Sequence, residues 1–328
     1  MHDALSRPLI SLYYESTLIL LCSTQRAEVR HCFNRLYNYG TVFSFESIGN
    51  SGTIYNSGNM GINHGSFGNS GTIYNSGTIS TCSGFCYFSN SGTIYNSATI
   101  SSGVLVNDGT INNTTGGYIA NHKGFLNYGT VVVASGATLT NDTLGFNGGG
   151  YGQSAGSTVV DGLLTSNAPI QIDGGTLSGS GVIQADVMMG GTMSPGDSPG
   201  KLTIIGNYTQ FSAGTFFAQL AGLKPGTQYS QLQVSDTATL DGTLDVVLLK
   251  GFVVHLGNSF VLMTFADEVG QFSTLDLPTL SAGEMWLLTY NAHNLTLSAV
   301  PSPEPSSLVL LGTGLLAGIG FLRHKLAQ

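Results

Sequence analysis

Asn50-Ser51-Gly52-Thr53-Ile54-Tyr55-Asn56 is the stretch of sequence that decides the fold, because close copies of it return at a nearly constant interval. Its opening Asn-x-Gly-Thr-Ile/Val unit recurs in steps of 19, 21, 17 and 20 residues, beginning at Asn50, Asn69, Asn90, Asn107 and Asn127. A related copy begins at Asn38, and a half-period copy begins at Asn75. A period near 20 residues is typical of a solenoid, in which each repeat forms one coil.

The chemistry of the unit predicts what each coil looks like. Asn and Gly tolerate positive φ, so Asn-x-Gly predicts a turn. Thr-Ile or Thr-Val predicts a short strand whose alternate residues face opposite ways. Stacked coils then bury one apolar column and carry an asparagine ladder at the corner after each strand. The column is predicted to contain Ile54, Ile73 and Ile94, and the ladder Asn56, Asn75 and Asn96.

Composition agrees with an all-β solenoid and excludes some partners. Charged residues make up 9% of the 328 residues, against about 25% in ordinary soluble domains, while glycine occurs 46 times. Recurrent glycine and β-branched residues, with no lasting apolar stripe of helical period, disfavour helix. The net charge is −8 with only ten Lys and Arg residues. No basic patch is present to neutralise phosphates, so we expect no nucleic-acid binding.

The chain divides into four parts. Residues 38–200 hold the solenoid repeats, and a turn-rich junction over residues 191–200 ends them. Residues 201–299 contain longer apolar runs and predict a β-rich continuation or cap. Residues 300–328 form a Pro-rich linker and an apolar tail, and residues 1–37 match no repeat. The apolar run near the start is interrupted by Glu15, so a degenerate signal peptide and a mis-called start both stay open.

The tail predicts one short transmembrane helix. Residues 308–322 carry no charge and are followed by Arg323 and Lys325. As a helix they would span about 22 Å, against about 30 Å for the hydrocarbon core, so the span is short. The alternative is a buried C-terminal helix. The basic end is expected to stay on the cytoplasmic side of the inner membrane.

Pro303-Glu304-Pro305, followed by the apolar span and a basic end, resembles the PEP-CTERM sorting signal of Gram-negative, exopolysaccharide-producing bacteria. The resemblance implies processing by an exosortase, a membrane cysteine protease. It further implies transit through the inner membrane, and then release to the cell surface or extracellular matrix. The residues that carry the resemblance are Pro303, Glu304, Pro305, Arg323 and Lys325.

A second resemblance covers the middle of the chain. Gly179-Ser180-Gly181-Val182-Ile183, the turn-rich run 194–200 and the segment 232–244 are similar to the passenger repeats of autotransporter adhesins. This resemblance implies a β-helix with a surface role and no particular activity.

A search for chemistry finds no convincing enzyme site. Glycoside hydrolysis needs two carboxylates at about 5–10 Å, and Asp161, Asp173 and Asp186 are not spaced by one coil. No metal-ligand set and no cofactor motif is present. Cys82 and Cys86, spaced C-x3-C, predict a local disulfide or two free thiols.

Tyr55, Tyr74 and Tyr95 recur at one position of the coil and form a possible stacking stripe for sugars. The alternative is that they only cover the strand surface. We therefore expect a parallel β-solenoid that acts as a non-enzymatic structural or adhesive surface protein, associated with exopolysaccharide. A polysaccharide lyase or hydrolase on the same fold, and a decayed gene copy, are the alternatives.

Overall fold

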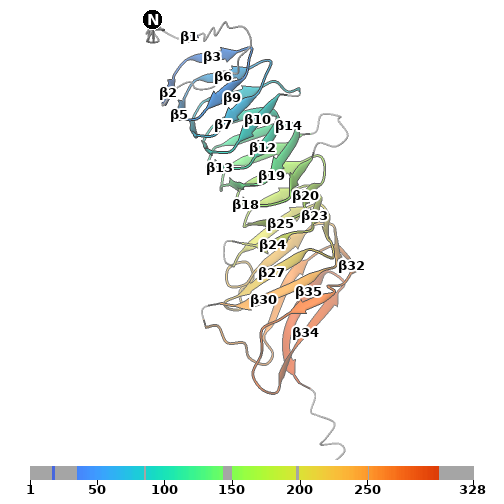
Figure 1. Cartoon of the computed structure of the whole chain (residues 1–328). Coiled ribbons are helices and arrows are strands. Elements are labelled where there is room, and N and C mark those ends of the chain that lie inside the picture. The colour runs from blue at the N-terminus through green and yellow to red at the C-terminus, as the bar shows by residue number, and fades with distance from the viewer. Residues whose placement is uncertain are drawn as a thin grey trace, which may run out of the picture.

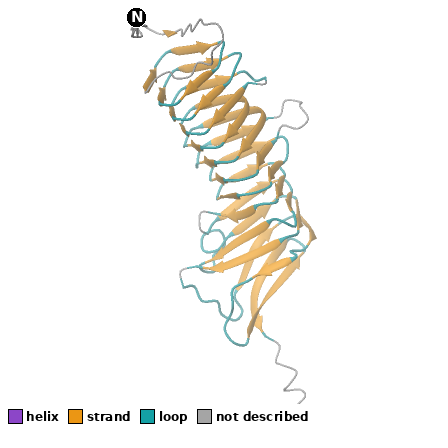
Figure 2. Cartoon of the chain, in the orientation of Figure 1, coloured by secondary structure: helices purple, strands orange, loops and turns teal. Residues whose placement is uncertain are grey.

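The computed structural model describes residues 17–18, 35–84, 86–142, 150–196, 199–249 and 251–302. Over these residues every regular element is a β-strand, and none is a helix (Figure 2). The strands stack along one elongated rod, from β2 and β3 near the N-terminus to β34 and β35 at the opposite end (Figure 1). The fold is therefore an all-β parallel solenoid, as the repeat predicts.

Each coil contributes a strand to each of three faces. The first face is a 12-stranded parallel sheet, in which residues one coil apart pair directly. Its strands are β2 (Arg35–Asn38), β5 (Thr53–Asn56), β8 (Thr72–Asn75), β11 (Thr93–Asn96), β13 (Thr110–Asn113), β15 (Thr130–Val133), β18 (Ser157–Val160), β21 (Thr176–Gly179), β24 (Thr192–Pro195), β27 (Thr215–Leu220), β30 (Thr243–Leu248) and β33 (Thr274–Asp276).

The second and third faces are joined into one sheet by two long strands, β12 (Thr99–Asn107) and β14 (Tyr118–Asn127), which turn the corner between them. The second face also contains β1 (Thr17–Leu18), β3 (Thr41–Ser44), β6 (Asn59–Ile62), β9 (Thr78–Thr81), β16 (Thr138–Asn141), β19 (Leu163–Ser166), β22 (Val182–Gln184), β25 (Lys201–Ile205), β28 (Gln231–Val234) and β31 (Ser259–Thr264). The third contains β4 (Ile48–Asn50), β7 (Phe67–Asn69), β10 (Tyr87–Asn90), β17 (Tyr151–Gln153), β20 (Ile170–Ile172), β23 (Val187–Met189), β26 (Tyr208–Gln210), β29 (Thr237–Leu240) and β32 (Asp267–Gly270).

The core follows the two-residue period of the strands. In Thr72–Asn75 the second and fourth side chains are buried, while the first and third face outward. The isoleucines Ile54, Ile73 and Ile94 pair in register and are at most 3% exposed. This confirms the predicted apolar column, which neighbouring coils bury for one another.

The predicted asparagine ladder is present and has a counterpart at a second corner. The Nδ2 of Asn56 donates to the Oδ1 of Asn75 at 2.7 Å, and that of Asn75 donates to Asn96 at 2.7 Å. The second ladder follows the third face, and it contains Asn50, Asn69, Asn90, Asn107 and Asn127. Each amide is buried, and its hydrogen bonds tie successive coils together.

Stacking continues without a break past residue 200 and then ends in an antiparallel cap. Strand β25 pairs in parallel with both β22 and β28, across the turn-rich junction. The cap is the hairpin of β34 (Glu284–Asn291) and β35 (Asn294–Pro301), and β35 lies antiparallel to β31. No helix among the described residues is long and apolar enough to span a membrane. The predicted span at residues 308–322 lies outside the described residues.

Candidate ligand-binding groove

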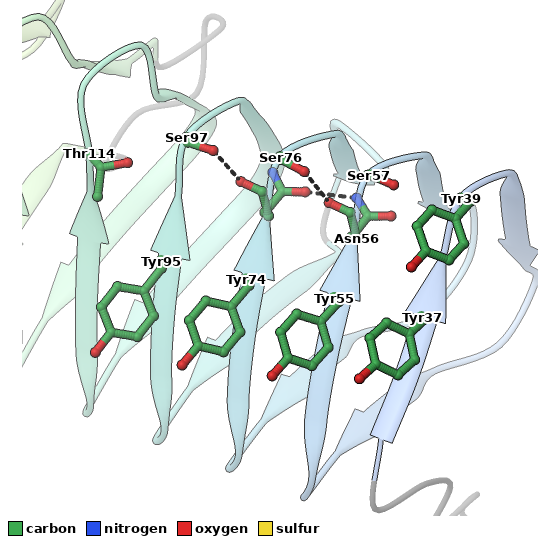
Figure 3. A pocket seen from close by; sticks show the side chains of 11 residues that line it. Tyr37, Tyr39, Tyr55, Asn56, Ser57, Tyr74, Ser76, Tyr95, Ser97 and Thr114 are labelled. Carbon is green, nitrogen blue, oxygen red and sulfur yellow. Dashed lines mark hydrogen bonds between the residues drawn. The ribbon is translucent and has the colours of Figure 1, made fainter.

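The tyrosine position of the first face forms one continuous row. Tyr37, Tyr55, Tyr74 and Tyr95 come from the adjacent strands β2, β5, β8 and β11. Successive ring centroids lie 4.9, 5.0 and 5.1 Å apart, and neighbouring planes differ by at most 8°. Figure 3 shows the rings side by side with their hydroxyls pointing the same way. The fold therefore brings the three sequence-predicted tyrosines together and adds Tyr37 to them.

A row of hydroxyl side chains runs beside the rings, at the corner after the same strands. Ser57 donates to the carbonyl of Asn38 at 3.2 Å, and Ser76 donates to that of Asn56 at 3.3 Å. Ser97 and Thr114 continue the pattern on the next two coils, at 3.1 and 2.9 Å. A hydroxyl has one proton and two lone pairs. Because the backbone takes the proton, the oxygens form a row of acceptors at the coil spacing.

Rings and hydroxyls together enclose a surface groove of about 390 Å³. Its lining consists of Tyr37, Tyr39, Tyr55, Asn56, Ser57, Tyr74, Asn75, Ser76, Tyr95, Ser97 and Thr114, none of which is charged. Over the described part of the chain, no hydroxyl of these five tyrosines bonds another protein group. The groove thus offers apolar ring surface, free phenol groups and fixed acceptors to a ligand.

The asparagine ladder holds this groove rigid from beneath. Asn75 sits one residue after Tyr74 and is 2% exposed. Its Nδ2 donates to Gly77 at 3.0 Å and to Thr99 at 3.0 Å, besides the next asparagine. These bonds fix the end of each strand, so the tyrosine preceding the ladder residue keeps the same position on every coil.

Tyr37 and Tyr39 are the lining residues that the sequence pattern does not reveal. The strand Arg35–Asn38 pairs in register with Thr53–Asn56, so the solenoid is already formed at Arg35. Arg35-Leu36 replaces the usual Thr-Ile, which hides this copy of the repeat. The signal that could have found it is Tyr37-Asn38, which matches Tyr55-Asn56 in spacing and identity.

The aspartates weighed as catalytic groups lie at three different corners of the coil. Asp161 follows the first face and accepts two hydrogen bonds from Ser180, at 2.9 and 3.0 Å. Asp186 lies between the second and third faces and accepts from Asn207 at 2.8 Å. Asp173 follows the third face and accepts from Gln171 at 2.8 Å. The structure therefore does not bring these three aspartates together.

A carboxylate pair lies elsewhere, near the wide end of the rod. Asp245 on β30 pairs in register with Asp276 on β33, both on the outer side of the first face. Burial raises the pKa of the Asp245 carboxyl above its ordinary value, and the negative charge of Asp276 raises it further. The spacing of 31 residues departs from the 20-residue period, so the sequence pattern does not indicate this pair. Within the described ranges, no group of three potential metal ligands occurs.

Cys82 and Cys86 are joined by a disulfide in the loop between β9 and β10. The bridge closes the corner where the second face passes to the third. Disulfides persist in oxidising surroundings outside the cytoplasm. The bond is therefore suited to an exported protein.

Comparison with known protein families identifies the tail. Residues 303–324 match the PEP-CTERM protein-sorting motif, which includes Pro303, Glu304, Pro305 and Arg323, while Lys325 lies one residue beyond the match. A comparison with curated proteins finds no match. The chain is thus a β-solenoid that carries a PEP-CTERM sorting signal. The signal implies processing by exosortase and transit through the membrane to the surface or exterior of a Gram-negative bacterium. The tail residues themselves lie outside the described residues.

Proposed function

We propose that this protein is a non-enzymatic structural and adhesive component of the extracellular matrix. The observation that carries the proposal is a rigid solenoid, with an uncharged groove of aromatic and hydroxyl side chains, on a chain that ends in a sorting signal. A surface of this kind recognises hydroxyl-rich partners and supplies no acid or base. It is therefore suited to holding polysaccharide.

The placement of the two features supports this function. The groove lies on the first four coils, whereas the described chain ends beside the cap at the opposite end of the rod (Figure 1). The sorting motif begins at residue 303, directly after β35. A chain held at its C-terminus would present the groove at its far end.

The test begins in cells with and without exosortase. We expect mass spectrometry of the mature protein to show loss of the chain beyond the Pro303–Pro305 motif only when the enzyme is present. We further expect that deleting the gene reduces matrix retained by the cells, and that the wild-type gene restores it. An intact tail in both strains would contradict sorting by exosortase. Normal matrix in the deletion strain would contradict the structural role.

The alternative is a polysaccharide-active enzyme, and one observation favours it. Asp245 and Asp276 are adjacent carboxylates, and the raised pKa of Asp245 is what a general acid requires. The purified protein would be incubated with neutral and acidic glycans, beside the Asp245→Asn variant. New reducing ends or unsaturated products that disappear in the variant would establish the enzyme and overturn the non-enzymatic proposal. We expect neither protein to release any product.

A further inference from the structure

The tyrosine groove repeats along the rod with a defined distance and a defined chemistry. Its rings are spaced by 4.9 to 5.1 Å, which is the distance between coils rather than a feature of any one side chain. A ligand that uses every ring must therefore repeat at the same distance. Monosaccharides in an extended β-1,4-linked hexose chain repeat at nearly this distance, whereas α-1,4-linked chains curl into a helix.

The polar side of the groove selects the same class of ligand. The oxygens of Ser57, Ser76 and Ser97 have given their protons to backbone carbonyls and are left as acceptors. A partner must supply one donor per coil, as the hydroxyls of a sugar chain do. The lining carries no charge, so nothing in it compensates the desolvation of an acidic sugar.

We propose that the row of Tyr37, Tyr55, Tyr74 and Tyr95 binds a neutral, extended β-1,4-linked polysaccharide that lies along the rod, one sugar per coil. The apolar C–H face of each sugar rests on a tyrosine ring, and its hydroxyls donate to the serine and threonine row. The inference rests on the matrix function proposed above and names its ligand. The principal competing occupant of such a row is a second copy of this chain, stacked ring against ring.

The test is isothermal titration calorimetry on the purified full-length chain with a β-1,4-linked glucose hexamer. The comparison ligands are the α-1,4-linked glucose hexamer and a β-1,4-linked mannuronate hexamer, which change the geometry and the charge separately. We expect binding of the neutral β-linked hexamer alone, with an affinity that does not depend on salt. Equal binding of all three hexamers, or binding of none, would overturn the proposal.

Variants locate the binding to the row. The triple variant Tyr55→Ser, Tyr74→Ser, Tyr95→Ser removes three ring contacts, and we expect a loss of affinity of about a hundredfold. The matched control replaces Tyr87, Tyr118 and Tyr128 by Ser; these are 45%, 41% and 44% exposed, close to Tyr74 and Tyr95, and lie outside the groove. Replacing the same three groove tyrosines by Phe keeps the rings and is expected to keep most of the affinity. Circular dichroism of each variant shows whether the solenoid is intact.

The remaining outcomes separate this inference from the proposed function. An equal loss of affinity in the groove and control variants would place the ligand elsewhere and overturn the inference. So would dimers of the wild-type chain that dissociate in the groove variant without any hexamer binding, because the row would then join two rods. In either case cells could still lose matrix when the gene is deleted, so the structural function would stand while its ligand assignment failed.

Discussion

At the scale of single residues, Asn75 illustrates how buried polar groups hold the coils together. Its amide makes three donor bonds and accepts one from Asn56 at 2.7 Å, all away from water. The change Asn75→Ala removes these bonds and leaves buried partners unsatisfied, at a cost of about 3 kcal/mol in the free energy of unfolding. Urea unfolding measures the loss. The control Asn59→Ala lies on an exposed position of the neighbouring coil and should change stability by less than about 0.5 kcal/mol.

Asp245 contributes in the opposite direction, and its effect depends on pH. Because burial and then Asp276 raise its folded-state pKa, ionisation of Asp245 opposes folding. Stability is therefore complete at acid pH, where the group is neutral in both states, and is lost as pH rises through the folded-state pKa. We expect Asp245→Asn to raise the melting temperature at pH 7 and to have little effect at about pH 3, below the ordinary aspartate pKa.

The neighbouring carboxyl supplies the control for this pH effect. The change Asp276→Asn removes only the charge repulsion and leaves the burial of Asp245, which is the larger cause. A smaller gain at pH 7 is therefore expected for Asp276→Asn than for Asp245→Asn. Equal gains from both variants, or a gain from Asp245→Asn that persists at acid pH, would contradict this account.

At the scale of the element, the turns between faces limit how closely coils approach. A Cβ on Gly92 would lie 2.0 Å from the carbonyl oxygen of Gly71 on the preceding coil, where no flexible side chain can move aside. We expect Gly92→Ala to lower the free energy of unfolding by about 2–3 kcal/mol. At Gly68 a Cβ would meet only the carbonyl oxygen of Ile48, at 3.9 Å. Comparable urea midpoints for Gly92→Ala and Gly68→Ala would show that the turn stacking is not limiting.

The repeat predicts the elements that carry it and misses those that do not. Thr-Ile-Tyr-Asn encodes a strand, a buried column and a ladder, and all three are present. The second ladder was not predicted, because Asn50 and Asn69 begin Asn-Ser-Gly and look like turn residues alone. In the structure they do both, ending a third-face strand and opening the turn. Third-face strands such as Ile48–Asn50 and Phe67–Asn69 share no motif beyond that asparagine, so sequence similarity could not locate them.

The groove was predicted in part for a related physical reason. Tyr55, Tyr74 and Tyr95 stand at one repeat position, so their alignment follows from the period. The hydroxyl acceptors do not follow from it, since Ser57 or Ser97 points at a carbonyl only after the coils are stacked. Burial and charge pairing across a 31-residue coil likewise set the pKa of Asp245, and no local pattern encodes them.

At the scale of the whole molecule, the solenoid changes width along its length. Registered residues of the first face are 19 apart between Thr53 and Thr72, but 31 apart between Thr243 and Thr274. The wider coils are filled by aromatic groups, such as Tyr229 packed edge-on against Phe260 at 5.4 Å. The narrow end thus carries the repeated surface groove, and the wide end carries the larger core and the cap beside the sorting motif.

The cap gives the last prediction. Without it β31 would leave a strand edge open, and open edges pair with other chains. Strand β35 covers that edge and buries Leu295 and Leu297 against the core. We expect a chain ending at residue 283 to form oligomers by size-exclusion chromatography with light scattering, whereas a chain ending at residue 302 stays monomeric. The second chain lacks the same tail, so any difference belongs to the hairpin.

Hydrogen exchange distinguishes an open edge from general unfolding in this experiment. In a solenoid each coil contacts only its neighbours, so loss of the cap acts locally. Amides of β5, β8 and β11 should keep their protection in the chain ending at residue 283, while those of β31 change. Loss of protection in the first coils as well would show that the rod folds as one cooperative unit from the capped end. A monomeric short chain with an unchanged melting temperature would show that the hairpin does not act as a cap.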